Sequence, residues 1–297
     1  MNDVNEALGK FTAMLRRDVQ RIWKAGVAYM GVSSFVTRFV ALAQRILLVR
    51  ILGPENIGHI AVVTSVMNII RLPAGVGTFT VVNKLVAENH NDVEVQKEVV
   101  GTSMIINLVT TMIVGICAWL MLTHTVWVSD MVANKLLRIL ILFLPFMIAS
   151  EILRNALMGQ HRMKTVATID ILLAVVTIIV VIPMVYFWSL KGWFINLTFS
   201  IVVALGLLLW SSRRVLSLKW NKTVAKTVVS IGTFAFLHQL TGSLLLQFDT
   251  LSVSGLLRNP ATTGVYNNAA LMAQQLQFIP GAVLTVVFPY VARNRGN

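Results

Sequence analysis

The stretch RILGPENIGHIAVVTSVMNIIRLPAGVGTFTVVNKLVAEN, residues 50–89, decides the fold. After a turn at Pro54 it continues as one apolar run, and the only strong cation in the middle of that run is Arg71. A helix needs about 20 mainly apolar residues to span a bilayer. Membrane-spanning strands would instead alternate apolar and polar residues. The stretch therefore predicts a transmembrane helix.

Other segments along the chain have the same character. The chain is 56% hydrophobic and only 12% charged, with a mean hydropathy of +0.76, whereas soluble domains carry about 25% charged residues. A soluble fold of this length could not bury so much apolar surface. We predict an all-α polytopic membrane protein with about eight transmembrane helices, at residues 26–49, 57–86, 101–123, 136–158, 165–188, 193–212, 228–256 and 264–291.

The basic residues indicate an orientation. The net charge is +13, but the charge lies in short clusters between apolar runs, which argues against a nucleic-acid partner and is typical of topology signals. With the N-terminus in the cytoplasm, sixteen of the 25 Lys and Arg residues fall on the cytoplasmic side and five outside. The remaining four lie within spans: Arg38, Arg45, Arg71 and Arg154.

The first 25 residues contain no apolar core of a cleavable signal peptide. Leu8, Phe11, Leu15, Ile22 and Trp23 recur at roughly helical spacing among basic residues. This pattern predicts an amphipathic helix on the cytoplasmic membrane surface, with a disordered tail as the alternative.

An internal repeat relates the first two spans to the last two. The second unit reads GLLRNPATTGVYNNAALMAQQLQFIPGAVLTVVFPYVARN, from Gly255. Each unit has paired aliphatic residues, a turn with Pro, a Gly that opens a helix, and a second Pro 15 or 16 residues later. The repeat predicts a complete six-helix lobe at 26–212, a basic cytoplasmic linker at 213–227 and the first two helices of a second lobe at 228–297. It also suggests that the chain is cut short at its C-terminus.

Several short motifs resemble the polysaccharide exporter and O-antigen flippase family of the multidrug/oligosaccharidyl-lipid/polysaccharide exporter superfamily. They are LVRILGPENIGHIAVV (48–63), AGVGTFTVVNKLVAE (74–88), EVVGTS (98–103), ALMGQHRM (156–163), QFDTLSVSGLL (247–257), TTGVYNNAALMAQQL (262–276) and FPYVAR (288–293). The resemblance implies two six-helix lobes in a bacterial cytoplasmic membrane. It implies a flippase for polyprenyl-pyrophosphate-linked oligosaccharide in surface polysaccharide synthesis, with a polymerase and chain-length machinery as further partners.

Charges within spans are costly and mark candidate sites. Arg38 and Arg45 lie seven residues apart on one helix face, and Arg71 lies just before a Pro-Gly break. Arginine binds phosphate oxygens bidentately and stays charged, so the three could line a cavity for pyrophosphate. The alternative is that one or more snorkels to an interface or pairs with an acid.

The other polar residues within spans allow alternative interpretations. Glu151 and Arg154, three apart, are expected to pair with each other, and Asp170 to act as a gate or to pair with Arg162 or Lys164. Asp249 could pair with a first-lobe arginine and respond to substrate or protons, or form a structural salt bridge. His238 could titrate or simply pack. A stripe of amides could contact sugar hydroxyls or join helices: Asn267, Asn268, Gln274, Gln275 and Gln277.

Enzyme chemistry is not indicated. The sequence has no P-loop, GxSxG, HExxH or CxxC pattern, and with one cysteine it suggests neither a metal site nor a cofactor. A transporter is therefore the first hypothesis. The alternatives are a drug or cation antiporter of the same fold, which would need an acidic cavity, and a non-transporting fragment or assembly partner in a polysaccharide-synthesis complex.

Overall fold

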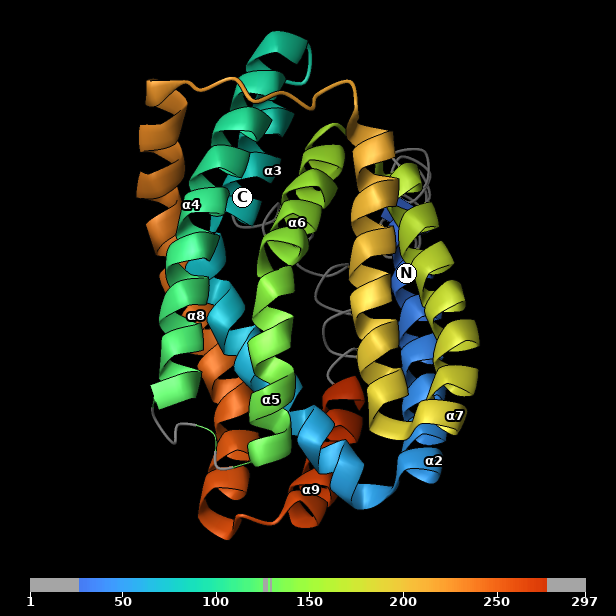
Figure 1. Cartoon of the computed structure of the whole chain (residues 1–297). Helices are drawn as coiled ribbons and strands as arrows, with labels where there is room; N and C mark the ends of the chain where they lie inside the picture. The colour runs from blue at the N-terminus through green and yellow to red at the C-terminus, as the bar shows by residue number, and fades with distance from the viewer. Residues whose placement is uncertain (1–26, 125–127, 129, 277–297) are drawn as a thin grey trace, which may run out of the picture.

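The computed structural model describes residues 27–124, 128 and 130–276, and these form a bundle of long helices lying side by side (Figure 1). The described part is helical and contains no strand. The expected surface helix at 1–25 and Gln277 lie outside the described residues. The all-α polytopic prediction is confirmed.

The first two expected spans are the two arms of a bent helix. Helix α2 runs over Val27–Gly75 and bends at Gly53, where φ is 73° and ψ is 170°. Glycine reaches this left-handed φ without steric cost, so the turn before Pro54 separates the arms as expected. After Gly77, at φ 64°, helix α3 continues the second span over Thr78–Glu88.

The next two spans follow the expected order. Helix α4 covers Val93–His124. The fourth expected span is continuous but has three parts: α5 at Met131–Leu140, the short 3-10 helix η1 at Ile141–Phe143, and α6 at Leu144–Gly159.

The last helices complete the bundle. Helix α7 at Met163–Ser212 holds the fifth and sixth expected spans and bends between them at Ser189. Helix α8 covers Lys222–Leu257 and α9 covers Pro260–Leu276. Four described stretches are long and apolar enough to cross a membrane: Val93–His124, Met131–Gly159, Met163–Ser212 and Lys222–Leu257. The chain is thus a multi-pass membrane protein.

The apolar core lies where α2, α3, α6 and α7 meet. Five apolar side chains are fully buried there, namely Ile57, Val63, Val82, Ile152 and Leu157. Large apolar side chains also cover the outside of the bundle, among them Phe39, Ile179, Phe234, Leu245 and Phe248. A bilayer accommodates such surface without the cost it would have in water.

The two ends of the bundle are built differently. The linker end carries the turns α3–α4 and α6–α7 and the segment 213–221, which runs across the top of Figure 1 from α7 to α8. The hairpin end carries the bends of α2 and α7, the last turn of α4, the first turn of α5 and the α8–α9 turn. The distribution of Lys and Arg predicts that the linker end faces the cytoplasm, and this stays a prediction.

The segment 213–221 is fastened to α4. The Asn221 side chain donates to Glu98 Oε2 at 2.6 Å, and the Asn221 backbone N–H donates to Thr102 Oγ1 at 2.9 Å. Lys219 Nζ donates to Glu94 Oε2 at 2.5 Å, and this bond raises the pKa of Lys219. Gly101 lets the segment pass close, because a Cβ there would lie 2.6 Å from the Ser217 carbonyl oxygen.

Candidate functional site

A cavity of about 290 Å³ lies between α2, α6 and α7, at the level of the apolar spans. Its walls are mostly aliphatic. Its charged lining residues come from three helices, namely Arg71 from α2, Glu151 and Arg154 from α6, and Asp170 from α7. The cavity therefore brings together four of the residues that the sequence singled out, two cations and two anions.

Two ion pairs cross the cavity between helices. Arg71 Nη2 lies 2.9 Å from Glu151 Oε1, with both side chains about one third exposed. Arg154 binds Asp170 through both carboxylate oxygens, with Nη2–Oδ2 at 2.7 Å and Nε–Oδ1 at 3.2 Å. This forked arrangement is the strong form of an arginine–carboxylate contact. The cavity is polar but balanced in charge.

The expected pair between Glu151 and Arg154 is wrong. The two are neighbours on α6, but each reaches a partner on another helix, Arg71 on α2 and Asp170 on α7. Asp170 pairs with Arg154 and not with Arg162 or Lys164, the partners that the sequence offered as the alternative to a gate role. Helical spacing allowed a local pair. The interhelical pair is favoured because Asp170 presents both of its carboxylate oxygens to the Arg154 guanidinium.

Arg45 joins α2 to α9. Its Nε donates to Asn268 Oδ1 at 2.7 Å and its Nη2 donates to Asn267 Oδ1 at 2.8 Å. Asn267 in turn donates to Thr250 Oγ1 of α8 at 3.3 Å. The sequence treated Arg45 and the two asparagines as separate sites, but the structure makes them one contact between spans 222 residues apart.

The other candidate residues do not line this cavity. Arg38 is exposed on the first arm of α2, and His238 is exposed on α8. Asp249, also exposed on α8, lies next to Tyr266 of α9. It takes part in none of the ion pairs among the described residues. Gln274 is half-buried on α9, and the side chain of Gln275 lies outside the described residues.

Sequence reasoning missed a buried pair at the hairpin end. His59 Nδ1 lies 2.5 Å from Asp130 Oδ2, and both side chains are less than a tenth exposed. Asp130 also caps α5 by accepting from the N–H groups of Val132 and Ala133. Burial opposes ionisation of Asp130, but the His59 bond and the two N–H groups outweigh it and lower its pKa. The sequence did contain one signal of this role: Asp130 directly precedes α5, and aspartate is a preferred N-cap residue.

The two glycines of the repeat also meet at the hairpin end. A Cβ on Gly58 would lie 1.8 Å from the Pro260 carbonyl oxygen, and a Cβ on Gly264 would lie 2.1 Å from the Pro54 carbonyl oxygen. Each repeat unit thus packs its Pro carbonyl against the Gly of the other. Only hydrogen side chains permit this approach.

The sequence of the chain matches a known family over nearly its whole length. The profile of the family described as polysaccharide biosynthesis protein covers residues 23–295. The chain belongs to this family. The resemblance to the polysaccharide exporters is therefore confirmed at the level of this family. No curated protein matches the sequence.

Solved structures similar to this family member are membrane transporters. A multidrug/oligosaccharidyl-lipid/polysaccharide (MOP) superfamily transporter from Pyrococcus furiosus, whose structure reports a binding pocket of reverse polarity, aligns with a TM-score of 0.65 and 19% identity over 84% of this chain and 60% of its own. An inward-facing multidrug resistance transporter of the MATE family aligns with a TM-score of 0.63 and 19% identity, over 86% of this chain and 62% of its own. A MATE transporter in complex with MaD5 aligns with a TM-score of 0.61 and 17% identity, over 91% of this chain and 75% of its own.

These likenesses show that the chain shares the fold of the solved transporters. The chain spans between 56% and 62% of the length of the first solved relatives. At this level of identity, what the relatives bind does not transfer to this chain. The site must be interpreted from its own residues.

Proposed function

We propose that the protein moves a polyprenyl-pyrophosphate-linked oligosaccharide across the bacterial cytoplasmic membrane, with its N-terminus in the cytoplasm, for the synthesis of a surface polysaccharide. Membership of the polysaccharide biosynthesis family supports the substrate class. The observation that carries the proposal is the Arg71–Glu151 pair, an exchangeable interhelical contact that lines a cavity among apolar helices.

The pair supplies a binding group that is stable before substrate arrives. An unpaired arginine among apolar helices would be costly, whereas a paired one is tolerated. A pyrophosphate can take the place of Glu151 on the Arg71 guanidinium, since both offer oxygens in the geometry of its fork. Substrate binding would then release Glu151 and break a contact between α2 and α6. The chemistry of recognition is in this way coupled to helix movement.

The packing supports a division into two lobes, 26–212 and 228–297, joined by 213–227. The contact of Gly58 with Pro260 and of Gly264 with Pro54 relates the two repeat units reciprocally, as a pseudo-two-fold axis would. Arg45 and the two asparagines lie along the same boundary between α2 and α9. Alternating access would open this boundary.

Further polar groups at the boundary have roles in the proposed cycle. Once Arg45 separates from them, Asn267 and Asn268 can hydrogen-bond sugar hydroxyls, together with Gln274 and Gln275. Asp249 and His238 on α8 are the titratable groups proposed for ion coupling. The polyprenyl tail stays in lipid.

The cation antiporter finds less support in the cavity. Such a carrier needs a negative site, but each carboxylate of this cavity faces an arginine within 3 Å. A non-transporting partner role is distinguished by the experiment below.

Complementation of a strain that lacks its lipid-linked oligosaccharide flippase tests the proposal, with surface polysaccharide as the readout. The chain should restore polysaccharide, and Arg71→Gln should reduce it at least about tenfold, the effect of losing a charge-assisted hydrogen bond. Arg50→Gln, at an exposed arginine of the same helix, is the matched control and should act as the wild type. The amount of folded protein is measured for each.

A charge exchange separates folding from transport. Arg71→Glu combined with Glu151→Arg restores the ion pair, so folding should recover while transport stays low, because the cation has moved from α2 to α6. Wild-type polysaccharide from a folded Arg71→Gln variant would contradict the cavity role. Failure of the wild-type chain to restore any polysaccharide, alone or together with a polysaccharide polymerase, would favour a non-transporting role.

A further inference from the structure

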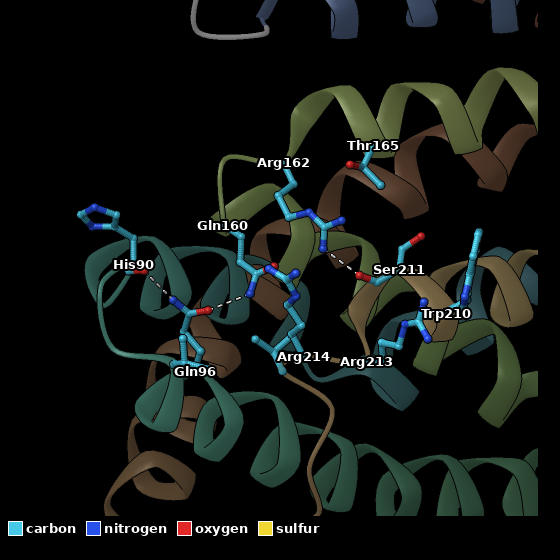
Figure 2. A pocket seen from close by; sticks show the side chains of 11 residues that line it. His90, Gln96, Gln160, Arg162, Thr165, Trp210, Ser211, Arg213 and Arg214 are labelled. Atoms are coloured by element: carbon cyan, nitrogen blue, oxygen red, sulfur yellow. Dashed lines mark hydrogen bonds between the residues drawn. The ribbon is translucent and has the colours of Figure 1, made fainter.

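A second cavity at the linker end is larger and has a different charge. Its volume is about 870 Å³, and it lies among the turns α3–α4 and α6–α7 and the end of α7 (Figure 2). Its charged lining residues are Arg162, Arg213 and Arg214, and no acidic residue lines it. None of the three arginines has a carboxylate within 4 Å among the described residues.

The floor of this cavity is fixed by side-chain amides. Gln96, only 2% exposed, donates to the carbonyl oxygens of Asn89 and His90, each at 2.9 Å. Gln160 donates to Gln96 Oε1 at 2.7 Å, which ties the α6–α7 turn to the α3–α4 turn. The turns that border the cavity are thus fixed to each other, and the three arginines lie among its lining residues.

Each arginine has guanidinium N–H groups that make no hydrogen bond within the described residues. Arg162 donates one N–H to the Ser211 carbonyl oxygen at 2.7 Å, while a guanidinium has five N–H groups in all. Arg213 lies over the Trp210 ring, 5.5 Å from its centroid. Figure 2 shows the Arg214 side chain extending toward Gln160, across from Arg162. The first turn of α7, which contributes Thr165, has no side-chain cap, so its N–H groups add positive potential.

The location indicates a ligand presented by the membrane. Trp210 is 65% exposed, and nearby Lys164 lies 4.7 Å from the ring centroid of Tyr29. Tryptophan and tyrosine gather at the level of lipid head groups. A cavity of this size suits a ligand of several groups, since small-molecule pockets run from about 300 to 1,000 Å³.

From this geometry we infer a binding site for a phosphorylated head group, in which Arg162, Arg213 and Arg214 hold the phosphate oxygens. The site is separate from the intramembrane cavity, whose arginines are already paired. Binding of the head group does not depend on transport. A role as the place where the transported lipid first docks does rest on the proposed function.

Calorimetric titration of the full chain in phosphatidylcholine nanodiscs tests the site. The probes are inorganic pyrophosphate, farnesyl diphosphate and uncharged farnesol. Both diphosphates should bind and compete with each other, and farnesol should not. Tighter binding of farnesyl diphosphate would identify a lipid-borne head group as the ligand, whereas equal affinities would identify the free diphosphate. Binding should weaken between about 50 and 500 mM salt, because exposed charges are screened.

Variants test the residues. The variants are made in an Arg71→Gln background, which removes the intramembrane arginine proposed to bind pyrophosphate. In that background Arg214→Gln should weaken diphosphate binding about tenfold and the triple Arg162→Gln/Arg213→Gln/Arg214→Gln variant should abolish it, since each loss removes charge-assisted bonds. Arg214→Lys should recover only part of the affinity because it lacks the fork. Lys226→Gln, an exposed cation of the same end outside the cavity, should bind as the wild type.

The outcomes separate this site from the transport proposal. Unchanged binding by a folded triple variant, or an equal loss in Lys226→Gln, would overturn the site. Arg71→Gln should leave diphosphate binding intact at the linker end. A chain that binds farnesyl diphosphate but restores no polysaccharide would contradict the proposed transport and leave this site standing.

Discussion

The hairpin end and the linker end of the bundle differ in how closely they are packed and in how their charged residues are paired. At the hairpin end, Gly58 and Gly264 bring backbones into direct contact, and the buried Asp130 side chain pairs with His59. At the linker end, three arginines surround a wide cavity with no carboxylate among its lining residues. We call the hairpin end the closed end, because its backbones pack in direct contact and its cavity is only about 240 Å³. We call the linker end the open end, because its arginines line a cavity of about 870 Å³.

The largest effect should come from breaking the buried His59–Asp130 pair of the closed end. Asp130→Ala leaves His59 buried without its partner and removes the cap of α5. We expect a loss of about 3–5 kcal/mol of stability, as for other broken buried pairs. Thermal unfolding in detergent measures it. Asp92→Ala removes an exposed cap at the linker end and should cost about 1 kcal/mol. Equal losses would show that the two ends do not differ.

The next largest effect should come from the backbone contact. Gly58→Ala and Gly264→Ala each place a methyl group within 2.1 Å of a carbonyl oxygen, so the repeat units must move apart, at a cost of about 1–3 kcal/mol. Gly206→Ala on α7 is the control, because nothing lies within 4 Å of its added Cβ. That variant should be neutral or slightly stabilised. A Gly58→Ala protein as stable as Gly206→Ala would mean that the hairpin end is loosely packed.

A smaller effect should appear with pH. Because the folded pKa of Asp130 is lowered below 3.8, its contribution is present above pH 3.8 and is lost as the pH falls through the folded pKa. Asp130→Asn keeps the shape and cannot ionise. Unfolding temperatures measured from pH 6 down to about pH 3 should therefore fall more steeply for the wild type than for this variant. Parallel curves would exclude Asp130 as the source.

The smallest effect on stability should come from the open end. Arg213 and Arg214 are exposed, and surface charges without acidic partners contribute little to folding. The double variant Arg213→Gln/Arg214→Gln should unfold within about 0.5 kcal/mol of the wild type. A marked stabilisation on neutralising them would indicate that the cluster is under strain from mutual repulsion.

The helices were predictable because their cause is local. Continuous apolar runs force helix formation in lipid, since every backbone polar group must be satisfied within the segment. The breaks were also visible, at the turn before Pro54 and between 188 and 193, where α2 and α7 bend. Family motifs could be read directly for the same reason, because they depend on order and spacing along the chain.

Charge partners were not predictable, because they depend on which helix faces which. Arg71, Arg154, Asp170 and Glu151 were all recognised as costly residues, yet the pairing within α6 was wrong. Spacing along one helix says nothing about an acid on the next. The same limit hid His59, which stands 71 positions from Asp130, and the meeting of Arg45 with the asparagines of α9.

The sequence by itself determined that this is a multi-pass helical membrane protein of a polysaccharide biosynthesis family, because hydropathy and motif order are properties of the chain alone. Only the tertiary structure decided how the charges are shared. It gave Arg71 and Arg154 their carboxylates and Arg45 its amides, and it left Arg162, Arg213 and Arg214 around an open cavity. The physical reason is that electrostatic energy depends on the distance between two charges in space. For residues on different helices, that distance cannot be calculated from their separation along the sequence.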